Sequence, residues 1–164
     1  MNTERTTISN DTAGRVSQSV HFLGSLLTFR AKAADTYGSF SIVEACSAPG
    51  AGSPPHLQSD AEGFLVTEGA FDFMLETTWQ RCGPGEFVYV RPGVVHAFRN
   101  PQDTPSRMLI INLPGGSHEN FFRAVGEPVE PGTTVFPPMG APDVAKLTME
   151  AARFGITILP PQQH

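Results

Sequence analysis

The sequence has few cysteines, so at most one disulfide within the chain can stabilise the fold. Its 164 residues include 2 cysteines, Cys46 and Cys82, which form no Cys-x-x-Cys pair and no disulfide framework. We expect two buried thiols in a reducing cytoplasm, and the alternative is a single disulfide between them.

Charge and long hydrophobic runs are also scarce. Charged residues make up 16% of the chain, the formal net charge is −5, and no cluster of lysine and arginine stands out. The sequence therefore indicates neither nucleic acid nor an anionic membrane as a partner. No run approaches the roughly 18 apolar residues of a membrane span, and no apolar signal-peptide segment is present near the N-terminus. We expect a cytoplasmic protein.

Glycine and proline, by contrast, are abundant, with 16 and 15 residues spread along the chain. Such spacing is typical of short strands separated by turns. The clearest strand pattern alternates Phe71, Phe73 and Leu75 with more polar neighbours. The length suits one domain with its own core. The sequence therefore predicts an all-β fold, either a closed sandwich or a barrel.

The chain divides into three predicted regions. Residues 1–19 are polar and are expected to form a flexible N-terminal arm. Residues 20–116 form the predicted β-barrel, and residues 117–164 form a C-terminal helical segment that packs on it. A short helix is expected over 119–125, with His118 at its N-terminus in no ligand role. A second helix is expected to begin at Pro142 and to end at Gly155.

Polar side chains suited to metal binding stand beside two of the predicted turns. His56 and Gln58 share one face if their segment is extended, and Glu62 reaches the same side across a short bend. His96 comes from a separate strand after a Pro-Gly turn. Two histidines and one carboxylate on the inner wall of a barrel match the facial triad of non-haem iron sites. The alternative is a polar pocket in which these residues only hydrogen-bond one another.

Both segments resemble the two sequence motifs of the cupin superfamily. The matching residues are Gly50, His56, Glu62 and Gly69 in the first motif, and Gly85, Gly93, His96 and Asn100 in the second. Gln58 stands where the first motif has a second histidine, and Arg91 stands where the second motif has proline. Over residues 20–160 the chain is similar to the small single-domain cupins related to quercetin 2,3-dioxygenases.

This resemblance implies a fold, a cofactor and an assembly. The implied fold is a cupin-type double-stranded β-helix, or jelly-roll, barrel with one or two C-terminal helices. The implied cofactor is one divalent transition metal (Fe, Mn, Ni, Co or Zn), held by His56, Glu62 and His96. Glu62 would also act as a catalytic residue that exchanges a proton with a substrate hydroxyl. The implied assembly is a homodimer.

Gln58 is assigned a catalytic role beside the metal, where it bonds a metal-bound water or the substrate. Direct ligation through its amide oxygen is the alternative. The substrate pocket is predicted to include Phe64, Phe73, Tyr89 and Phe98. Arg91 either pairs with an anionic substrate at the pocket rim or is a solvated turn residue, and we favour the second interpretation.

Three functions fit these residues. The leading hypothesis is a metal-dependent dioxygenase that acts on a small apolar or aromatic molecule, flavonoid-like or polyketide-like. The second is a non-oxidative isomerase, cyclase or decarboxylase of small-molecule biosynthesis, which the altered position Gln58 motivates. The third is a non-catalytic cupin that binds a small ligand. One fold hosts many chemistries, so the motifs do not choose among the three.

Overall fold

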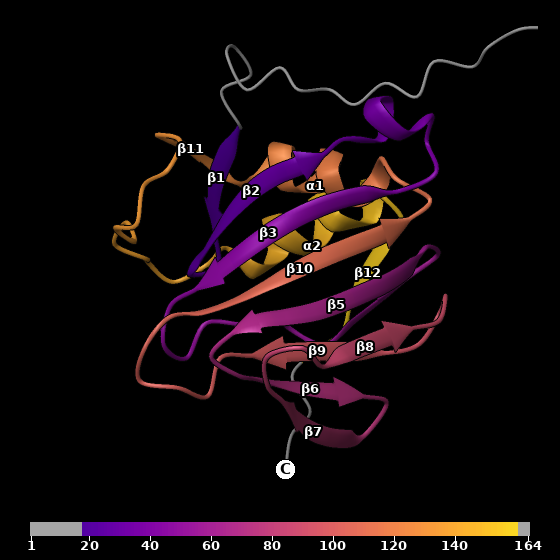
Figure 1. The fold of residues 1–164 in the computed structure, drawn as a ribbon. Coiled ribbons are helices and arrows are strands. Elements are labelled where there is room, and N and C mark those ends of the chain that lie inside the picture. The colour runs from indigo at the N-terminus through magenta and orange to yellow at the C-terminus, as the bar shows by residue number, and fades with distance from the viewer. Residues whose placement is uncertain (1–17, 161–164) are drawn as a thin grey trace, which may run out of the picture.

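The computed structural model describes residues 18–160, and within them two antiparallel sheets face each other (Figure 1). The larger sheet has the strand order β11 (Glu127–Val129), β1 (Ser19–Phe22), β2 (Ser25–Ala31), β3 (Ser41–Ser47), β10 (Ser106–Leu113), β5 (Ala61–Glu68) and β8 (Phe87–Val90). The smaller sheet has the order β12 (Ile156–Ile158), β4 (His56–Gln58), β9 (His96–Arg99), β6 (Phe71–Leu75) and β7 (Thr78–Cys82). The predicted all-β architecture is confirmed.

Alternation of side chains places the core between the two sheets. Along β10, Met108 and Ile110 are buried, whereas Leu109 and Ile111 are partly exposed on the other face. Successive strand residues point to opposite faces, so this pattern is what a strand with one covered face requires. Residues from both sheets fill the interior, among them Val43, Phe64, Val66, Phe71 and Phe73. The cysteines Cys46 and Cys82 are free and buried, as expected.

Two α-helices and one short 3-10 helix complete the described residues. They are α1 (Ser117–Val125), α2 (Val144–Arg153) and η1 (Ala33–Thr36). In Figure 1, α1 and α2 lie together behind the larger sheet. The ring centroids of Phe121 and Phe154 lie 6.1 Å apart. Within residues 18–160, no helix has the length and apolar character needed to cross a bilayer.

Helix α2 begins later than the sequence predicted. The expected start was Pro142, but the helix begins at Val144 and Asp143 is its N-cap residue. The Asp143 carboxylate accepts a hydrogen bond from the Lys146 backbone N–H at 3.0 Å. A side-chain cap of this kind satisfies one of the free N–H groups of the first turn, so it fixes the boundary.

The C-terminal region supplies strands as well as helices. Strand β12 pairs with β4, with Ile158 opposite His56, and β11 pairs with β1. Strand β11 was not predicted, because Pro128 lies within it and proline is confined to sheet edges. Strand β1 begins at Ser19, and residues 1–17 of the expected N-terminal arm lie outside the described residues.

Candidate metal centre

Two histidines face each other inside the smaller sheet. His56 on β4 and His96 on β9 are register partners, and their ring centroids lie 4.2 Å apart. Both side chains are buried, with 8% and 1% exposure. Each turn that precedes its strand also orients the ring: His56 Nδ1 lies 2.9 Å from the Pro54 carbonyl, and His96 Nδ1 lies 2.9 Å from the Val94 carbonyl. The two rings therefore enter the site in fixed orientations.

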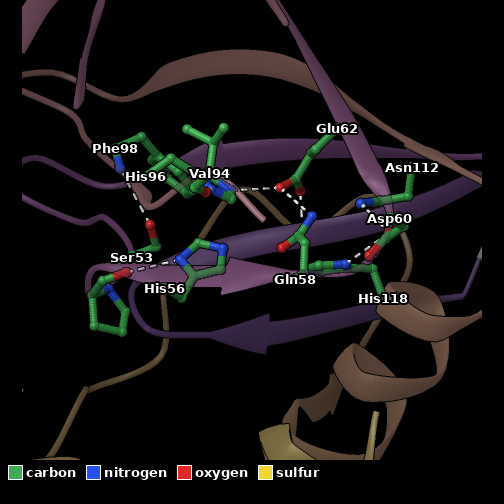
Figure 2. A network of polar contacts seen from close by, with 11 residues as sticks. Ser53, His56, Gln58, Asp60, Glu62, Val94, His96, Phe98, Asn112 and His118 are labelled. Carbon is green, nitrogen blue, oxygen red and sulfur yellow. Dashed lines mark hydrogen bonds and ion pairs between the residues drawn. The ribbon is translucent and has the colours of Figure 1, made fainter. Parts of the chain in front are cut away.

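Glu62 on β5 meets these histidines from the opposite sheet (Figure 2). Its Oε2 lies 2.9 Å from His96 Nε2 and accepts a hydrogen bond from Gln58 Nε2, also at 2.9 Å. Two atoms that bind one ion at about 2.1 Å and at right angles lie about 3.0 Å apart. The spacing of the carboxylate and the His96 imidazole therefore suits two ligands of a single ion.

Burial and neighbouring charges shift the pKa values of His56 and Glu62. Burial lowers the pKa of His56 to about 4, and neighbouring His96 contributes to the same effect. Burial alone would raise the pKa of Glu62, but His118, His96 and His56 outweigh it and lower that pKa to about 2. At neutral pH the site therefore presents a neutral His56 imidazole beside an ionised carboxylate, and both are the ligand forms that metals bind.

His118 is the site residue that the sequence analysis missed. It lies in the first turn of α1, as expected, but its side chain is only 3% exposed and enters the site. Its Nε2 lies 4.0 Å from Glu62 Oε1, and its Nδ1 lies 3.3 Å from Asp60 Oδ2. Figure 2 shows His118 reaching the site from the helix, while the other site residues come from strands and the β4–β5 bend. Burial lowers the pKa of His118, but Glu62 and Asp60 outweigh it and raise that pKa.

A glycine turn makes this approach of His118 feasible. A Cβ on Gly115 would lie 2.6 Å from the Phe40 carbonyl carbon, and Gly116 has a positive φ of 117°. Only glycine fits both conditions, so the chain leaves β10, turns tightly and starts α1 against the barrel end. The signal available in the sequence was the pair Gly115-Gly116 followed within two residues by a histidine.

Gln58 faces the same site and is 3% exposed. A carboxylate only accepts hydrogen bonds, so the Gln58 amide nitrogen must face Glu62. Its carbonyl oxygen Oε1 is then buried with no protein partner. An unsatisfied buried acceptor costs about 1–3 kcal/mol, which a donor on a bound ligand would recover.

An apolar cavity adjoins these polar groups. His56, Glu62 and His118 contribute to its wall, and the remaining lining is mainly apolar, including Phe22, Leu27, Phe64, Phe98, Phe121, Phe122, Leu147 and Ile158. Its volume is about 60 Å³. The site is therefore enclosed mainly by hydrocarbon.

The predicted pocket residues fall into two groups. Phe64 and Phe98 line the cavity, whereas Phe73 is 3% exposed and packs in the core with its ring centroid 5.1 Å from that of Phe64. The pocket assignment of Tyr89 is corrected, because its side chain is exposed, and Arg91 is exposed too, as the favoured solvated-turn interpretation expects. Glu62 is the register partner of Val90, so Val90 shares the inner face and Tyr89 points outward. Arg91 follows as a solvated turn residue.

The structure places the His56 and His96 rings with their centroids 4.2 Å apart and places Glu62 in contact with His96. The group of ligand atoms that the structure brings together for a metal includes His118 and not His96. Ligand atoms of His56, Glu62 and His118 all lie within 4.8 Å of one another. The donor set of imidazole and carboxylate suits a divalent transition metal, although these donors alone do not select which one.

Comparisons with known proteins identify the fold. Residues 43–112 match the protein family described as Cupin domain. No curated protein matches the chain significantly. Among solved structures, an RmlC-like cupin from Shewanella frigidimarina has 16% identity and a TM-score of 0.52, and the match covers 62% of this chain and 86% of that chain.

Two further structures bear names that describe a reaction. The polyketide cyclase RemF from Streptomyces resistomycificus has 20% identity and a TM-score of 0.51, over 61% of this chain and 70% of that one. Oxalate decarboxylase from Bacillus subtilis has 15% identity and a TM-score of 0.54, over 60% of this chain but only 27% of the longer enzyme. At these identities the likeness concerns the fold alone. The chain has the predicted cupin-type jelly-roll barrel with two helices.

Proposed function

We propose that this protein is a metal-dependent cupin enzyme, a dioxygenase that acts on a small apolar or aromatic substrate. The observation that carries the proposal is the meeting of His56, His96 and Glu62 in one buried spot, from three strands of two sheets. Burying an ionised carboxylate is costly unless it is paired, and a cation among these ligands would offset that cost.

His56, Glu62 and His96 would hold the ion, and Gln58 would support Glu62 from beside it. A bound divalent transition metal supplies a Lewis acid and open positions for substrate oxygen and O2. Gln58 Nε2 donates to Glu62 Oε2 and thereby fixes the direction of the carboxylate. The ionised Glu62 is a proton acceptor within reach of a substrate hydroxyl that enters the cavity.

The apolar lining defines the substrate class. Phe64, Phe98 and Phe122 surround the space beside the polar groups, and such walls bind hydrocarbon or aromatic surface and exclude water. A dry cavity of roughly 150 Å³ holds one benzene ring. The present volume of about 60 Å³ is smaller. A flavonoid-like or polyketide-like ring system therefore enters only when part of the lining, such as Leu147 on α2 or Ile158 on β12, moves outward.

Gln58 favours a second candidate, a non-oxidative isomerase, cyclase or decarboxylase. Its free carbonyl oxygen accepts a hydrogen bond from substrate, while the Asp60–His118 pair provides a proton donor close to Glu62. These groups move protons without any oxidant. The structural likeness to a polyketide cyclase and to an oxalate decarboxylase supports this alternative as a fold analogy.

Oxygen consumption separates the two candidates. Protein purified without chelator would be assayed with a panel of hydroxyaromatic compounds, with and without O2, beside the Glu62→Gln and His96→Ala variants. The proposal expects O2 uptake coupled to product, lost in both variants while circular dichroism stays unchanged. Turnover under strict anaerobiosis would support the second candidate instead. Tight ligand retention with no product from any compound would support a binding protein, and full activity in both variants would refute the site.

A further inference from the structure

We infer that His118, delivered by α1, is a ligand of the metal in this centre and takes the place of the imidazole that Gln58 lacks. The inference rests on the proposed metal-dependent function and deepens it. It makes the centre a site of three imidazoles and one carboxylate, in which one ligand comes from the C-terminal helical segment and not from the barrel.

The ring nitrogens of His118 are oriented as those of a metal ligand. In His118 the Nδ1 atom faces Asp60 Oδ2 at 3.3 Å, just as Nδ1 of His56 and of His96 faces a backbone carbonyl. Carbonyl and carboxylate oxygens only accept hydrogen bonds, so each Nδ1 carries a hydrogen. When a metal displaces the Nε2 proton, the lone pair of the ring lies on Nε2. Metal-binding histidines are commonly oriented in this way by an acceptor at the other nitrogen.

His118 also lies within reach of the other ligands. His118 Nε2 lies 4.0 Å from Glu62 Oε1, and it groups with ligand atoms of His56 and Glu62 within 4.8 Å. Two atoms that bind one ion at about 2.1 Å lie between about 3.0 Å apart at right angles and about 4.2 Å apart when opposite. The 4.0 Å spacing of His118 Nε2 and Glu62 Oε1 lies within this range, so this pair can bind one ion without a movement of α1.

Gln58 occupies the position whose imidazole His118 would replace. Gln58 Nε2 is committed to Glu62 Oε2, and an amide nitrogen with its hydrogens is no metal ligand. Of the two Glu62 oxygens, Oε2 lies near Gln58 and His96, and Oε1 lies near His118. The imidazole missing from the barrel motif is present in space, on a different element.

Two buried polar residues support His118 from behind. Asn112 Nδ2 donates to Asp60 Oδ2 at 3.2 Å, and the same oxygen faces His118. Asn112, Asp60 and His118 are 0%, 6% and 3% exposed. A purely structural role, in which a protonated His118 docks α1 through ion pairs with Asp60 and Glu62, would give Nε2 the same position. The two roles nevertheless predict different effects of His118 on metal affinity and on the spectrum of the bound metal.

Cobalt binding tests the inference. Metal-depleted wild-type protein, His118→Gln and His96→Ala would be titrated with Co²⁺, with affinity from calorimetry and coordination from visible absorption. The matched control is His21→Gln, which changes another buried histidine, on β1, 6% exposed. Removing even an outer partner of a ligand weakens metal binding about 10- to 100-fold, so losing His118 itself should weaken it about 100-fold or more and change the spectrum. His21→Gln should match wild type.

The outcomes separate this inference from the proposed function. If wild type and His118→Gln bind Co²⁺ equally with the same spectrum while His96→Ala does not, the His118 assignment fails and the metal centre stands. If wild type binds no Co²⁺, both fail. Should His118→Gln not fold, wild type with ¹⁵N-labelled histidine and ¹¹³Cd²⁺ decides by NMR. Three Nε2 resonances coupled to cadmium are expected, and two from His56 and His96 alone would overturn the inference.

Discussion

The charge of Glu62 should set the acid stability of the metal-free protein. Its pKa is lowered from the ordinary 4.5 to about 2, because the three surrounding histidines outweigh the effect of burial. At roughly 1.4 kcal/mol per pH unit, this lowering corresponds to about 3 kcal/mol of folding free energy. A carboxyl group with a depressed pKa contributes stability above its unfolded-state value, and that contribution is lost as the pH falls toward its folded-state value.

The perturbation is Glu62→Gln in metal-depleted protein, measured by urea unfolding between pH 6 and pH 2. Glu130→Gln is the matched control, since it makes the same chemical change at an exposed glutamate. Wild type should exceed Glu62→Gln by about 3 kcal/mol near pH 6, and the difference should shrink between pH 4.5 and pH 2. The control should follow wild type throughout. A Glu62→Gln difference that is near zero at pH 6, or that stays constant down to pH 2, would refute the ion-pair account of the site.

Three further outcomes are expected. In metal-free protein, burial lowers the pKa of His56 from the ordinary 6.5 to about 4. Because the unfolded chain then takes up this proton more readily than the folded one, the free energy of unfolding should fall as the pH drops from 6.5 to 4. His56→Gln should flatten that part of the urea-unfolding profile, and an unchanged slope would contradict the burial of a neutral ring. Gln58→Leu should keep one metal per chain by elemental analysis but lower turnover about 10- to 100-fold, because Glu62 loses its orienting donor; loss of the metal would instead make Gln58 a ligand. Light scattering at micromolar concentration should give twice the 17.6 kDa chain mass for the proposed homodimer, and a monomer mass would reject it.

The strands and the first three site residues could be predicted because their signals are local. The strand predicted from the alternation of Phe71, Phe73 and Leu75 is observed as β6, although Asp72 and Met74 on its other face are buried too. The turns before His56 and His96 mark where each histidine enters a strand, and one register pair then brings them together. Glu62, a carboxylate that follows His56 closely in the sequence, then completed the predicted set of ligands.

The errors arise where a side chain is placed by distant contacts. His118 reaches Asp60 across 58 residues of sequence, and no short-range pattern reports that contact. The side on which Tyr89 points depends on the register between β8 and β5, which the alternation within β8 alone does not fix. Strand β11 depends in the same way on its partner β1. Sequence periodicity gives the faces of an element, but tertiary packing decides which face is inside.

The convergence of ligands on one cation is tested most directly by elemental analysis combined with X-ray absorption spectroscopy. The protein would be purified without added metal and without chelator, beside His96→Ala. The account predicts one divalent transition metal per wild-type chain, with nitrogen and oxygen neighbours at about 2.0–2.2 Å, and little or none in His96→Ala. Wild-type protein that is catalytically active yet contains no metal, or equal metal in both proteins, would contradict it.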